Sequence, residues 1–457
     1  MQQFENDVKN YMEKSGAIGL IVSAFKADGT VLYEKSFGYS DKKKQTVLNN
    51  ETICGVASMS KSFTIVAILQ LVEKGIINLD EPVKTYLPEF ENVGNGVLKI
   101  RDFFSHAGGF FPLKRTIMTD VLSMLNTNYD LNKEHCFDAK IAKKATEVTV
   151  SKYAQETTYT GSIGENASYS NDTFGLLSEI VRRHGAENSF AEYVKKNIFE
   201  PLGMMRTTVE FILPLLDENV QTQYMGKDGV FDEYHDFYNN ASALMGGGSI
   251  KSTINDLQKY IRFFLTNDET KSNEICNSEL IEAMMQPTVR ISPTVDYGWG
   301  LSVEKVGTDK FIGHGGALTG VSSNMLWSKK QQVGVVVLCN TSNVPVALIA
   351  KELLCTVLNM PKPVVEIPPV VMWTVNEKTA IIGKYESKEG DTIEVVEAVD
   401  DNSLVVTIEN VTYPLITTGV GVAYFEGKFA PTILQFFYNE TGQSYAIRHG
   451  YRMLPKK

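Results

Sequence analysis

Strand-like sequence stands at both ends of the first 360 residues, and this placement constrains the fold more than any other feature. Near the N-terminus, the runs 18–25 and 31–37 are separated by the turn signal Asp28-Gly29, so we expect them to pair antiparallel. Strand-like runs return only after about residue 290, and helical patterns fill the interval. We therefore predict an α/β fold of the α+β sandwich type, with one antiparallel sheet built from both ends, flanking helices, and a helical region inserted at about 76–290.

The expected helices repeat apolar residues at helical spacing, and the later strands are short runs rich in β-formers. The continuous Val335-Val336-Val337 is typical of a strand buried on both faces. The predicted helices cover 4–14, 58–74, 101–105, 173–183, 189–198, 254–265, 278–285 and 344–358, and the later strands cover 300–306, 321–327 and 332–338.

A proline cluster separates this first domain, predicted at 1–360, from the rest of the chain. Four of the 15 prolines lie within 361–369, which indicates a stiff extended linker over 361–374. Beyond it we predict a separate antiparallel β-barrel-like domain at 375–457, lipocalin-like or another accessory barrel. Its expected strands cover 392–397, 404–409, 422–426, 432–439 and 444–448.

The charge balance excludes several classes of protein. With 44 Lys and Arg against 54 Asp and Glu, the net charge is −10 and the longest basic block is Lys42-Lys43-Lys44, so nucleic acid is excluded as a partner. No apolar run approaches the roughly 20 residues of a transmembrane segment. Residues 1–15 lack a signal-peptide core, so we expect a cytoplasmic protein, or an exported one if a leader has been removed.

The five cysteines are scattered and never form a Cys-x-x-Cys pair, so we expect buried free thiols rather than disulfides or metal ligands. No cluster of histidines or acidic residues predicts a metal site either. The cysteines are Cys54, Cys136, Cys276, Cys339 and Cys355.

One local motif points to nucleophilic chemistry. Ser58-Met59-Ser60-Lys61 opens the helix expected at 58–74, and residues three apart share a helix face, so the side chains of Ser58 and Lys61 can meet. A serine hydroxyl is a weak nucleophile alone, whereas an adjacent amine held neutral by burial can take its proton. The alternative is that the serines only cap the helix.

Two further motifs supply partners for such a nucleophile. In Tyr169-Ser170-Asn171, a phenol can carry protons and an amide can orient groups in a cleft, with helix capping as the alternative. Gly313-His314-Gly315-Gly316-Ala317 lies on or beside a strand. Its glycines let backbone N–H groups approach a ligand, and one such N–H can form half of an oxyanion hole, although a simple turn would also explain the glycines.

In this order, Ser-x-x-Lys, Tyr-x-Asn and a His-containing glycine strand resemble the serine β-lactamase-like family. That family includes class C β-lactamases, D-alanyl-D-alanine carboxypeptidases, D-aminopeptidases and related esterases. The resemblance covers about residues 10–355 and implies a sheet built from both termini, with the active site between sheet and helical region. It extends to the segments 37–41, 79–83, 86–89, 100–108, 198–204, 246–253 and 313–316.

The resemblance implies catalytic roles for three of the matching side chains and a binding role for a fourth. Ser58 would be the acylated nucleophile and Lys61 its proton partner. Tyr169 would relay protons between the nucleophile, the leaving group and the deacylating water. Asn171 would bind Lys61 and the substrate amide. No cofactor and no metal are implied.

The glycine strand would bind the substrate. His314, Gly315 and Gly316 would line the substrate site, and the backbone N–H groups of Ser58 and Ala317 would form the oxyanion hole. His314 stands where β-lactamases of this family carry lysine. A neutral imidazole binds a carboxylate less strongly than an ammonium, so this departure counts against penicillins or C-terminal D-alanine as substrates and favours esterase, amidase or aminopeptidase activity.

Three other features receive structural interpretations. His106 lies in a scaffold segment of the family, and the glycine run 246–248 lacks the strand and spacing of a dinucleotide loop. The stretch 109–166 is longer than the family's usual connection and is expected to form either a lid over the cleft or a surface insertion. Its aromatic residues and histidine are Tyr129, His135, Tyr153 and Tyr159.

We therefore predict a serine hydrolase that acts through an acyl-enzyme on an amide or ester, with a small-molecule or peptide substrate and a homo-oligomer as a further expectation. Two alternatives stay open: β-lactamase or D-alanyl-D-alanine carboxypeptidase activity proper, and a non-catalytic penicillin-binding or regulatory protein that works through its C-terminal module. The joint presence of Ser58, Lys61 and Tyr169 favours the enzyme.

Overall fold

The structure is a computed structural model that describes most of the chain. The described residues are 1–114, 121, 123–124, 139–210, 217–227, 230–234, 244–266, 275–365, 367–398 and 403–457. Tyr129, His135 and Cys136 lie outside them.

The first sheet has eight strands in the order β2-β1-β12-β11-β10-β9-β8-β7, and the neighbours pair antiparallel. The N-terminal pair therefore lies beside the last strand of the region, β12, which confirms the predicted sheet built from both ends. The strands are β1 (Gly19–Lys26), β2 (Val31–Gly38), β7 (Val289–Arg290), β8 (Val295–Tyr297), β9 (Ser302–Val306), β10 (Asp309–Leu318), β11 (Val321–Ser328) and β12 (Val333–Cys339).

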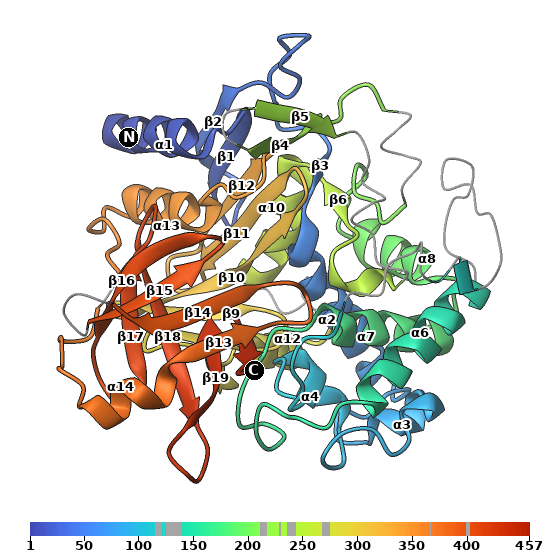
Figure 1. Cartoon of the computed structure of the whole chain (residues 1–457). Helices are drawn as coiled ribbons and strands as arrows, with labels where there is room; N and C mark the ends of the chain where they lie inside the picture. The colour runs from blue at the N-terminus through green and yellow to red at the C-terminus, as the bar shows by residue number, and fades with distance from the viewer. Residues whose placement is uncertain are drawn as a thin grey trace.

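Helices cover both faces of this sheet (Figure 1). Along β12, Val335 and Val337 belong to the apolar core shared with α1 (Gln2–Ser15) and α13 (Val346–Val357). Val336 and Leu338 face the opposite way, into the core shared with α10 (Ile254–Leu265) and the helical region. The valine run is thus buried on both faces because successive strand residues point to opposite sides.

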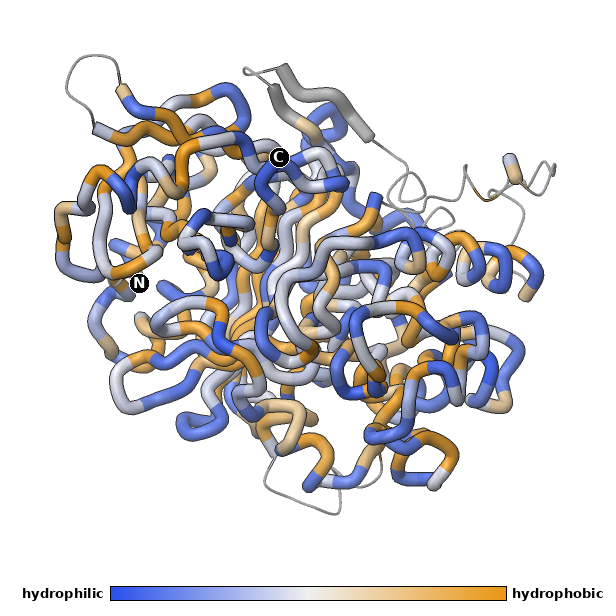
Figure 2. The backbone as a smooth tube through the Cα atoms, turned by 60° about the horizontal axis from the view of Figure 1, so that its bottom comes forward, coloured by the Kyte–Doolittle hydropathy of each residue, from blue (hydrophilic) through white to orange (hydrophobic). Residues whose placement is uncertain are grey.

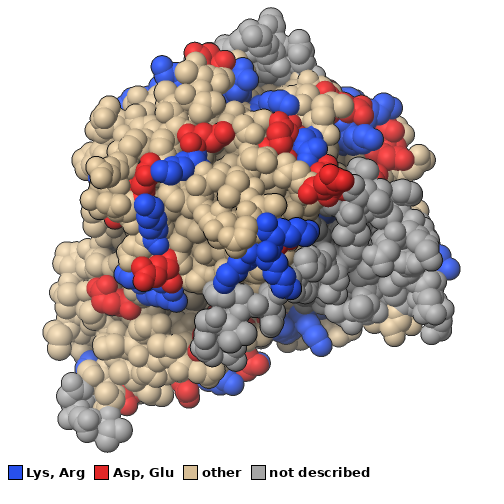
Figure 3. All heavy atoms as spheres, turned by 90° about the horizontal axis from the view of Figure 1, so that it is seen from above, with Lys and Arg blue, Asp and Glu red and all other residues tan. Residues whose placement is uncertain are grey.

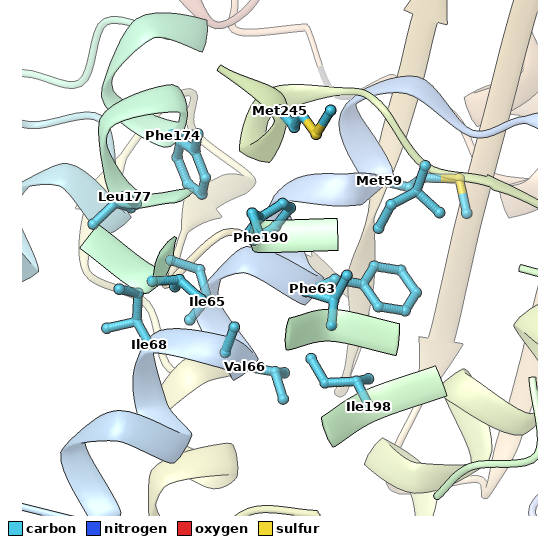
Figure 4. Close-up of a cluster of buried hydrophobic side chains, with 14 of the residues drawn as sticks. Met59, Phe63, Ile65, Val66, Ile68, Phe174, Leu177, Phe190, Ile198 and Met245 are labelled. Carbon is cyan, nitrogen blue, oxygen red and sulfur yellow. The ribbon is translucent and has the colours of Figure 1, made fainter. Parts of the chain in front are cut away.

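The helical region is organised around α2 (Ser60–Glu73), whose residues 60–71 are all buried. Such a helix is apolar on all sides because it is surrounded by other elements. Figure 4 shows Phe63, Ile65 and Val66 of α2 facing side chains of neighbouring helices. The surrounding helices are α3 (Val83–Tyr86), α4 (Ile100–Phe104), α6 (Ala139–Ala154), α7 (Asn171–His184), α8 (Phe190–Val194), the π-turn η3 (Lys195–Phe199) and α12 (Ser278–Met284).

Part of the interval 76–290 differs from the prediction. Helix α6 was not expected, because its threonines and valines weaken a helical pattern that its buried side chains nevertheless follow. Strands also occur before residue 290: β6 (Lys251–Ser252) pairs with β3 (Cys54–Gly55), and β4 (Gln223–Lys227) pairs with β5 (Val230–Tyr234). The two-residue strands β3 and β6 leave too little alternation to be recognised.

The C-terminal strands form a second eight-stranded antiparallel sheet in consecutive order, which we call the barrel. A bridge between Tyr385 and Lys456 joins its first strand to its end, and its apolar core is separate from the other two. Figure 1 shows the barrel beside the first sheet. Its strands are β13 (Gly383–Glu386), β14 (Thr392–Glu397), β15 (Leu404–Ile408), β16 (Val411–Thr417), β17 (Val422–Glu426), β18 (Pro431–Tyr438), β19 (Ser444–His449) and β20 (Arg452–Pro455).

The barrel-like prediction is therefore confirmed, although the sequence pattern missed β13, β16 and β20. These strands are short or half exposed, so their alternation is weak. A short helix, α14 (Val375–Ile381), precedes β13 and begins with a capping box between Thr374 and Glu377. The predicted domain boundaries and the lipocalin-like relationship stay predictions.

The barrel is attached to the first region by buried polar contacts. Arg448 on β19 is 4% exposed, and its guanidinium donates to the carbonyls of Ala167, Arg290 and Ile291. The backbone N–H of Met453 donates to Ser168 Oγ at 3.2 Å. Because buried hydrogen-bonding groups need partners, these contacts fix β19 and β20 against the segment that precedes α7.

The molecular surface carries charges of both signs. On the face in Figure 3, basic and acidic side chains lie among uncharged ones. Figure 2 shows hydrophobic and hydrophilic segments distributed throughout the backbone. None of the helices in the described ranges combines the length and the apolar character that crossing a membrane requires. Cys54, Cys276, Cys339 and Cys355 are buried free thiols, as expected.

Candidate active site

Ser58 lies in a tight turn at the entrance to α2. The 3₁₀ turn Ala57–Met59 precedes the helix, and Ala57 has a left-handed φ of 48°, which a residue with a Cβ adopts only when its surroundings impose it. Ser60 supplies part of that constraint: its Oγ donates to Ala57 O at 2.6 Å and accepts from Ile250 N at 3.0 Å. The local sequence therefore builds a turn that presents Ser58 to the cleft.

Lys61 lies one helical turn after Ser58 and is fully buried. Its Nζ donates to Ser58 Oγ at 3.1 Å, to Asn171 Oδ1 at 2.8 Å and to Gly247 O at 2.7 Å. The glycine run 246–248 thus contacts Lys61 through a backbone carbonyl. The structure brings the Ser-x-x-Lys and Tyr-x-Asn motifs together, although 110 residues separate Lys61 from Asn171.

Tyr169 completes this group of side chains. It hydrogen-bonds to Ser58, and its ring lies between two cations, with Lys61 Nζ at 4.6 Å and Arg452 Cζ at 5.0 Å from the ring centroid. Burial raises the pKa of the Tyr169 phenol, whereas the hydrogen bond to Ser58 and the charge of Arg452 lower it. Ser170 is the residue that caps α7, because its Oγ accepts from Thr173 N.

The glycine strand is β10. Position 316 is a glycine because there is no room for a larger residue. A Cβ at Gly316 would lie 2.3 Å from Val56 O and 2.4 Å from Ser323 Oγ. Ser323 on β11 in turn donates to Val56 O at 2.8 Å. The strand therefore packs directly against the backbone that precedes Ser58, and Gly315, Gly316 and Ala317 line the same cleft as the nucleophile.

His314 belongs to a buried chain of hydrogen bonds. Ser170 N–H donates to His106 Nδ1 at 3.2 Å, so the proton of His106 is on Nε2, which faces Tyr297 Oη at 3.3 Å. Tyr297 then donates to His314 Nε2 at 2.9 Å, and His314 Nδ1 donates to Gly315 O at 2.5 Å. Both histidines are neutral in this arrangement, because each accepts at one ring nitrogen.

Burial and neighbouring charges keep these histidines neutral. Burial, followed by the charge of Lys61, lowers the pKa of His314 to about 3. The same two causes lower the pKa of His106 well below its ordinary value. The interpretation of His106 as structural stays a prediction, but the structure places it directly beside the candidate site, with its ring 4.3 Å from that of Tyr169.

A cleft of about 840 Å³ between the first region and the barrel is lined by Ser58, Tyr169, Asn171, Tyr297 and His314. The barrel contributes Glu389, from the turn between β13 and β14, and Arg452, from the start of β20. Arg452 Nε donates to Glu389 Oε2 at 2.5 Å, and Glu389 Oε1 accepts from Asn171 Nδ2 at 3.5 Å. Tyr169 N also donates to the carbonyl of Tyr451 at 2.8 Å.

Sequence reasoning did not identify Tyr297, Glu389 or Arg452 as site residues. None lies in a recognisable motif, and Glu389 and Arg452 come from the predicted C-terminal β domain. In the stretch 109–166, expected to form either a lid or a surface insertion, Tyr153 and Tyr159 pack in or against the core of the helical region. Within the described ranges, no group of three or more His, Cys, Asp or Glu side chains is arranged to hold a metal ion.

A family model described as Beta-lactamase matches residues 4–354. Penicillin-binding protein 4* of Bacillus subtilis (strain 168) is 25% identical over 327 residues, which cover 69% of this chain and 66% of that protein. D-aminopeptidase of Brucella anthropi is 25% identical over 315 residues, which cover 68% of this chain and 53% of that protein. The chain thus spans between half and two thirds of the length of these relatives.

The fold as a whole also has a solved counterpart. The octameric penicillin-binding protein homologue from Pyrococcus abyssi superposes with a TM-score of 0.67 at 24% identity, and the match covers 100% of this chain and 99% of that one. The similarity therefore includes the barrel as well as the first region.

Proposed function

Since the chain belongs to the Beta-lactamase family, we propose that it is a serine hydrolase that cleaves amide or ester bonds through an acyl-enzyme on Ser58. The observation that carries the proposal is the contact of Ser58 Oγ with Lys61 Nζ, at 3.1 Å, together with its hydrogen bond to Tyr169. A hydroxyl that meets two proton-carrying groups in an open cleft is the arrangement that nucleophilic catalysis requires.

In acylation, Ser58 Oγ attacks the substrate carbonyl carbon and its proton passes to the Lys61–Tyr169 pair. The pair takes up that proton in the state in which Tyr169 is a phenolate and Lys61 an ammonium: the proton passes to the Tyr169 oxygen, and Lys61 Nζ, 3.1 Å from Ser58 Oγ, stabilises the charge that develops there. The carbonyl oxygen becomes an oxyanion, to which we assign the backbone N–H groups of Ser58 and Ala317. When the bond to the leaving group breaks, Tyr169 donates a proton to the departing amine or alkoxide.

In deacylation, a water molecule attacks the ester carbonyl of the acyl-enzyme. Tyr169, which has given its proton to the leaving group, accepts a proton from that water and passes it to Ser58 Oγ as the acid is released. Asn171 holds Lys61 in place through its Oδ1 and presents its amide nitrogen to the cleft side. Apart from these side chains, the steps use only the substrate and water.

The relatives support an amide or ester substrate. One is named as a penicillin-binding protein and another as a D-aminopeptidase, so amide-type acyl groups are the first substrates to test. We propose a small molecule or peptide as the occupant of the cleft. Penicillin is tested alongside, because hydrolysis or lasting retention of a β-lactam would point to the two alternative functions.

The experiment is intact-mass spectrometry after incubation with a fluorophosphonate and, separately, with a penicillin, followed by peptide mapping. We expect a fluorophosphonate adduct on Ser58 and, in Ser58→Ala, loss of the adduct with turnover reduced by about 10⁴-fold or more. Ser151→Ala, at an exposed serine of α6, is the matched control. Normal turnover with alanine at 58 would disprove the proposal.

The penicillin arm separates the alternatives. A penicillin adduct that persists for hours would indicate a penicillin-binding protein. An adduct that disappears with release of the opened β-lactam would indicate β-lactamase activity. Absence of any adduct with both reagents would favour a non-catalytic role for the chain.

A further inference from the structure

We propose that the barrel takes part in catalysis: Arg452, held by Glu389, is a positioning residue of the catalytic centre and acts through Tyr169. This inference rests on the proposed function and extends it to a part of the chain that lies beyond the region matched by the family model, which ends at residue 354. It is carried by the position of the guanidinium against the Tyr169 ring.

The first step is the geometry around Tyr169. Lys61 Nζ lies 4.6 Å and Arg452 Cζ lies 5.0 Å from the centroid of its ring, so two positive charges flank one phenol. Both cations favour the charged form of the phenol, and a phenol that releases its proton more easily is a better proton relay. Only Lys61 comes from the first region.

The second step is the neutrality of His314. Tyr297 donates to its Nε2, its Nδ1 donates to Gly315 O, and the ring carries no positive charge. His314 therefore cannot supply the second cation beside Tyr169, although the resemblance places a lysine at this position in related enzymes. Arg452 supplies that charge from the opposite wall of the cleft.

The third step is the attachment of Arg452 to the catalytic side chains. Glu389 Oε2 accepts from Arg452 Nε, and its Oε1 faces Asn171 Nδ2, so one carboxylate contacts both the barrel arginine and the amide that binds Lys61. Tyr169 N–H also donates to the carbonyl of Tyr451, the residue before Arg452. The guanidinium position is thus coupled to the backbone of Tyr169 itself.

Glu389 opposes Arg452 electrostatically while it holds it. Arg452 lowers the pKa of the Tyr169 phenol, and Glu389 raises it. Removal of one charge or the other should therefore move the pH dependence of Ser58 reactivity in opposite directions. A merely structural role for the two residues would not produce shifts of opposite sign.

The test uses the full chain and probes that carry no charge: a fluorophosphonate that labels Ser58, and p-nitrophenyl butyrate. Arg452→Met keeps a long unbranched side chain but removes its charge. We expect about a 10-fold fall in the labelling rate and in kcat, with KM for the ester changed less than about 3-fold. Arg452→Lys, which keeps the charge, should recover most of the rate.

The pH profiles of labelling provide the second readout. The pH of half-maximal labelling should move upward in Arg452→Met and downward in Glu389→Gln. Lys384→Ala removes a half-exposed cation of β13 that does not line the cleft, and it should leave the profile unchanged. Thermal unfolding of each variant identifies those that fail to fold, and Glu389→Gln tests the inference even if Arg452→Met is unstable.

Three results would overturn the inference. Equal losses in Arg452→Lys and Arg452→Met would mean that shape, not charge, matters. If the pH profiles of labelling did not move in Arg452→Met and Glu389→Gln, or moved in the same direction in both, Arg452 would not act through Tyr169. The third result would be that Arg452→Met slows hydrolysis of an ester that carries a carboxylate, the phenylacetylglycyl ester of m-hydroxybenzoate, but not of the corresponding phenyl ester. Arg452 would then be a binding residue for substrate carboxylates. An unlabelled wild-type chain would instead contradict the proposed function.

Discussion

The first sheet joins strands from the two ends of its region, whereas the barrel takes its eight strands in consecutive order. In the first sheet, the N-terminal β1 pairs with β12, more than 300 residues later. In the barrel, each strand pairs with the next, so most of its contacts are local. Both sheets have eight strands, but they differ in how many distant segments of the chain they bring to the cleft.

This difference explains where the chemistry lies. Segments distant in sequence meet beside the glycine strand of the first sheet, and this brings together Ser58, Asn171 and Gly247. The barrel contributes residues of two turns and of the strands that adjoin them, such as Glu389 and Arg452. A non-local assembly can gather groups from many segments, while a local one presents its edges to a neighbour.

The largest expected effect tests the groups that the first region brings together from distant segments. Lys61→Ala removes the group that contacts Ser58, Asn171 and Gly247, and we expect a fall of about 10²–10⁴-fold in the rate of fluorophosphonate labelling at Ser58. Lys74→Ala, at the exposed C-terminal end of the same helix, should label like the wild type. Equal rates for Lys61→Ala and the wild type would remove Lys61 from the mechanism.

The second effect compares a glycine in a strand of the first sheet with a glycine in the connection between β16 and β17 of the barrel. In Gly316→Ala, the new Cβ would meet Val56 O and Ser323 Oγ, neither of which can move freely, and we expect the free energy of unfolding to fall by about 2–4 kcal/mol. Gly419→Ala in the barrel meets nothing within 4 Å and should change stability by less than about 1 kcal/mol. Urea unfolding measures both, and similar values would contradict the steric argument.

The smallest effect concerns pH. In the unfolded chain His314 binds a proton below about pH 6.5, whereas burial keeps the folded histidine neutral until its pKa of about 3. The unfolded state therefore binds more protons between these values, and the free energy of unfolding should fall as the pH falls, by up to about 1.4 kcal/mol per pH unit from this residue. Urea unfolding at pH 7.5, 6 and 5 measures the slope.

A matched pair of variants isolates that contribution. His314→Gln keeps hydrogen-bonding capacity but cannot titrate, so its stability should depend less on pH than that of the wild type. His449→Gln in the barrel should flatten the slope less, because His449 is partly exposed although burial also lowers its pKa. An unchanged slope in His314→Gln would show that the buried histidine is not responsible.

Much of this architecture could be predicted from local patterns. The turn signal Asp28-Gly29 and the valine run at 335–337 each specify an element by spacing alone, and both match the structure. Helix α6 was missed because β-branched residues weaken its signal. Tyr297 was missed because a tyrosine on a three-residue strand carries no motif.

The sequence by itself determined the Ser-x-x-Lys turn, because residues three apart on a helix share one face whatever surrounds them. It also determined that a region with many helices is followed by an all-β region, because helical spacing and strand alternation are local properties of the sequence. Only the tertiary structure decided that His314 is neutral, that Tyr169 lies between two cations, and that Arg452 is one of them. Charge, burial and contact in a cleft depend on which distant segments are packed together, and no local pattern encodes that packing.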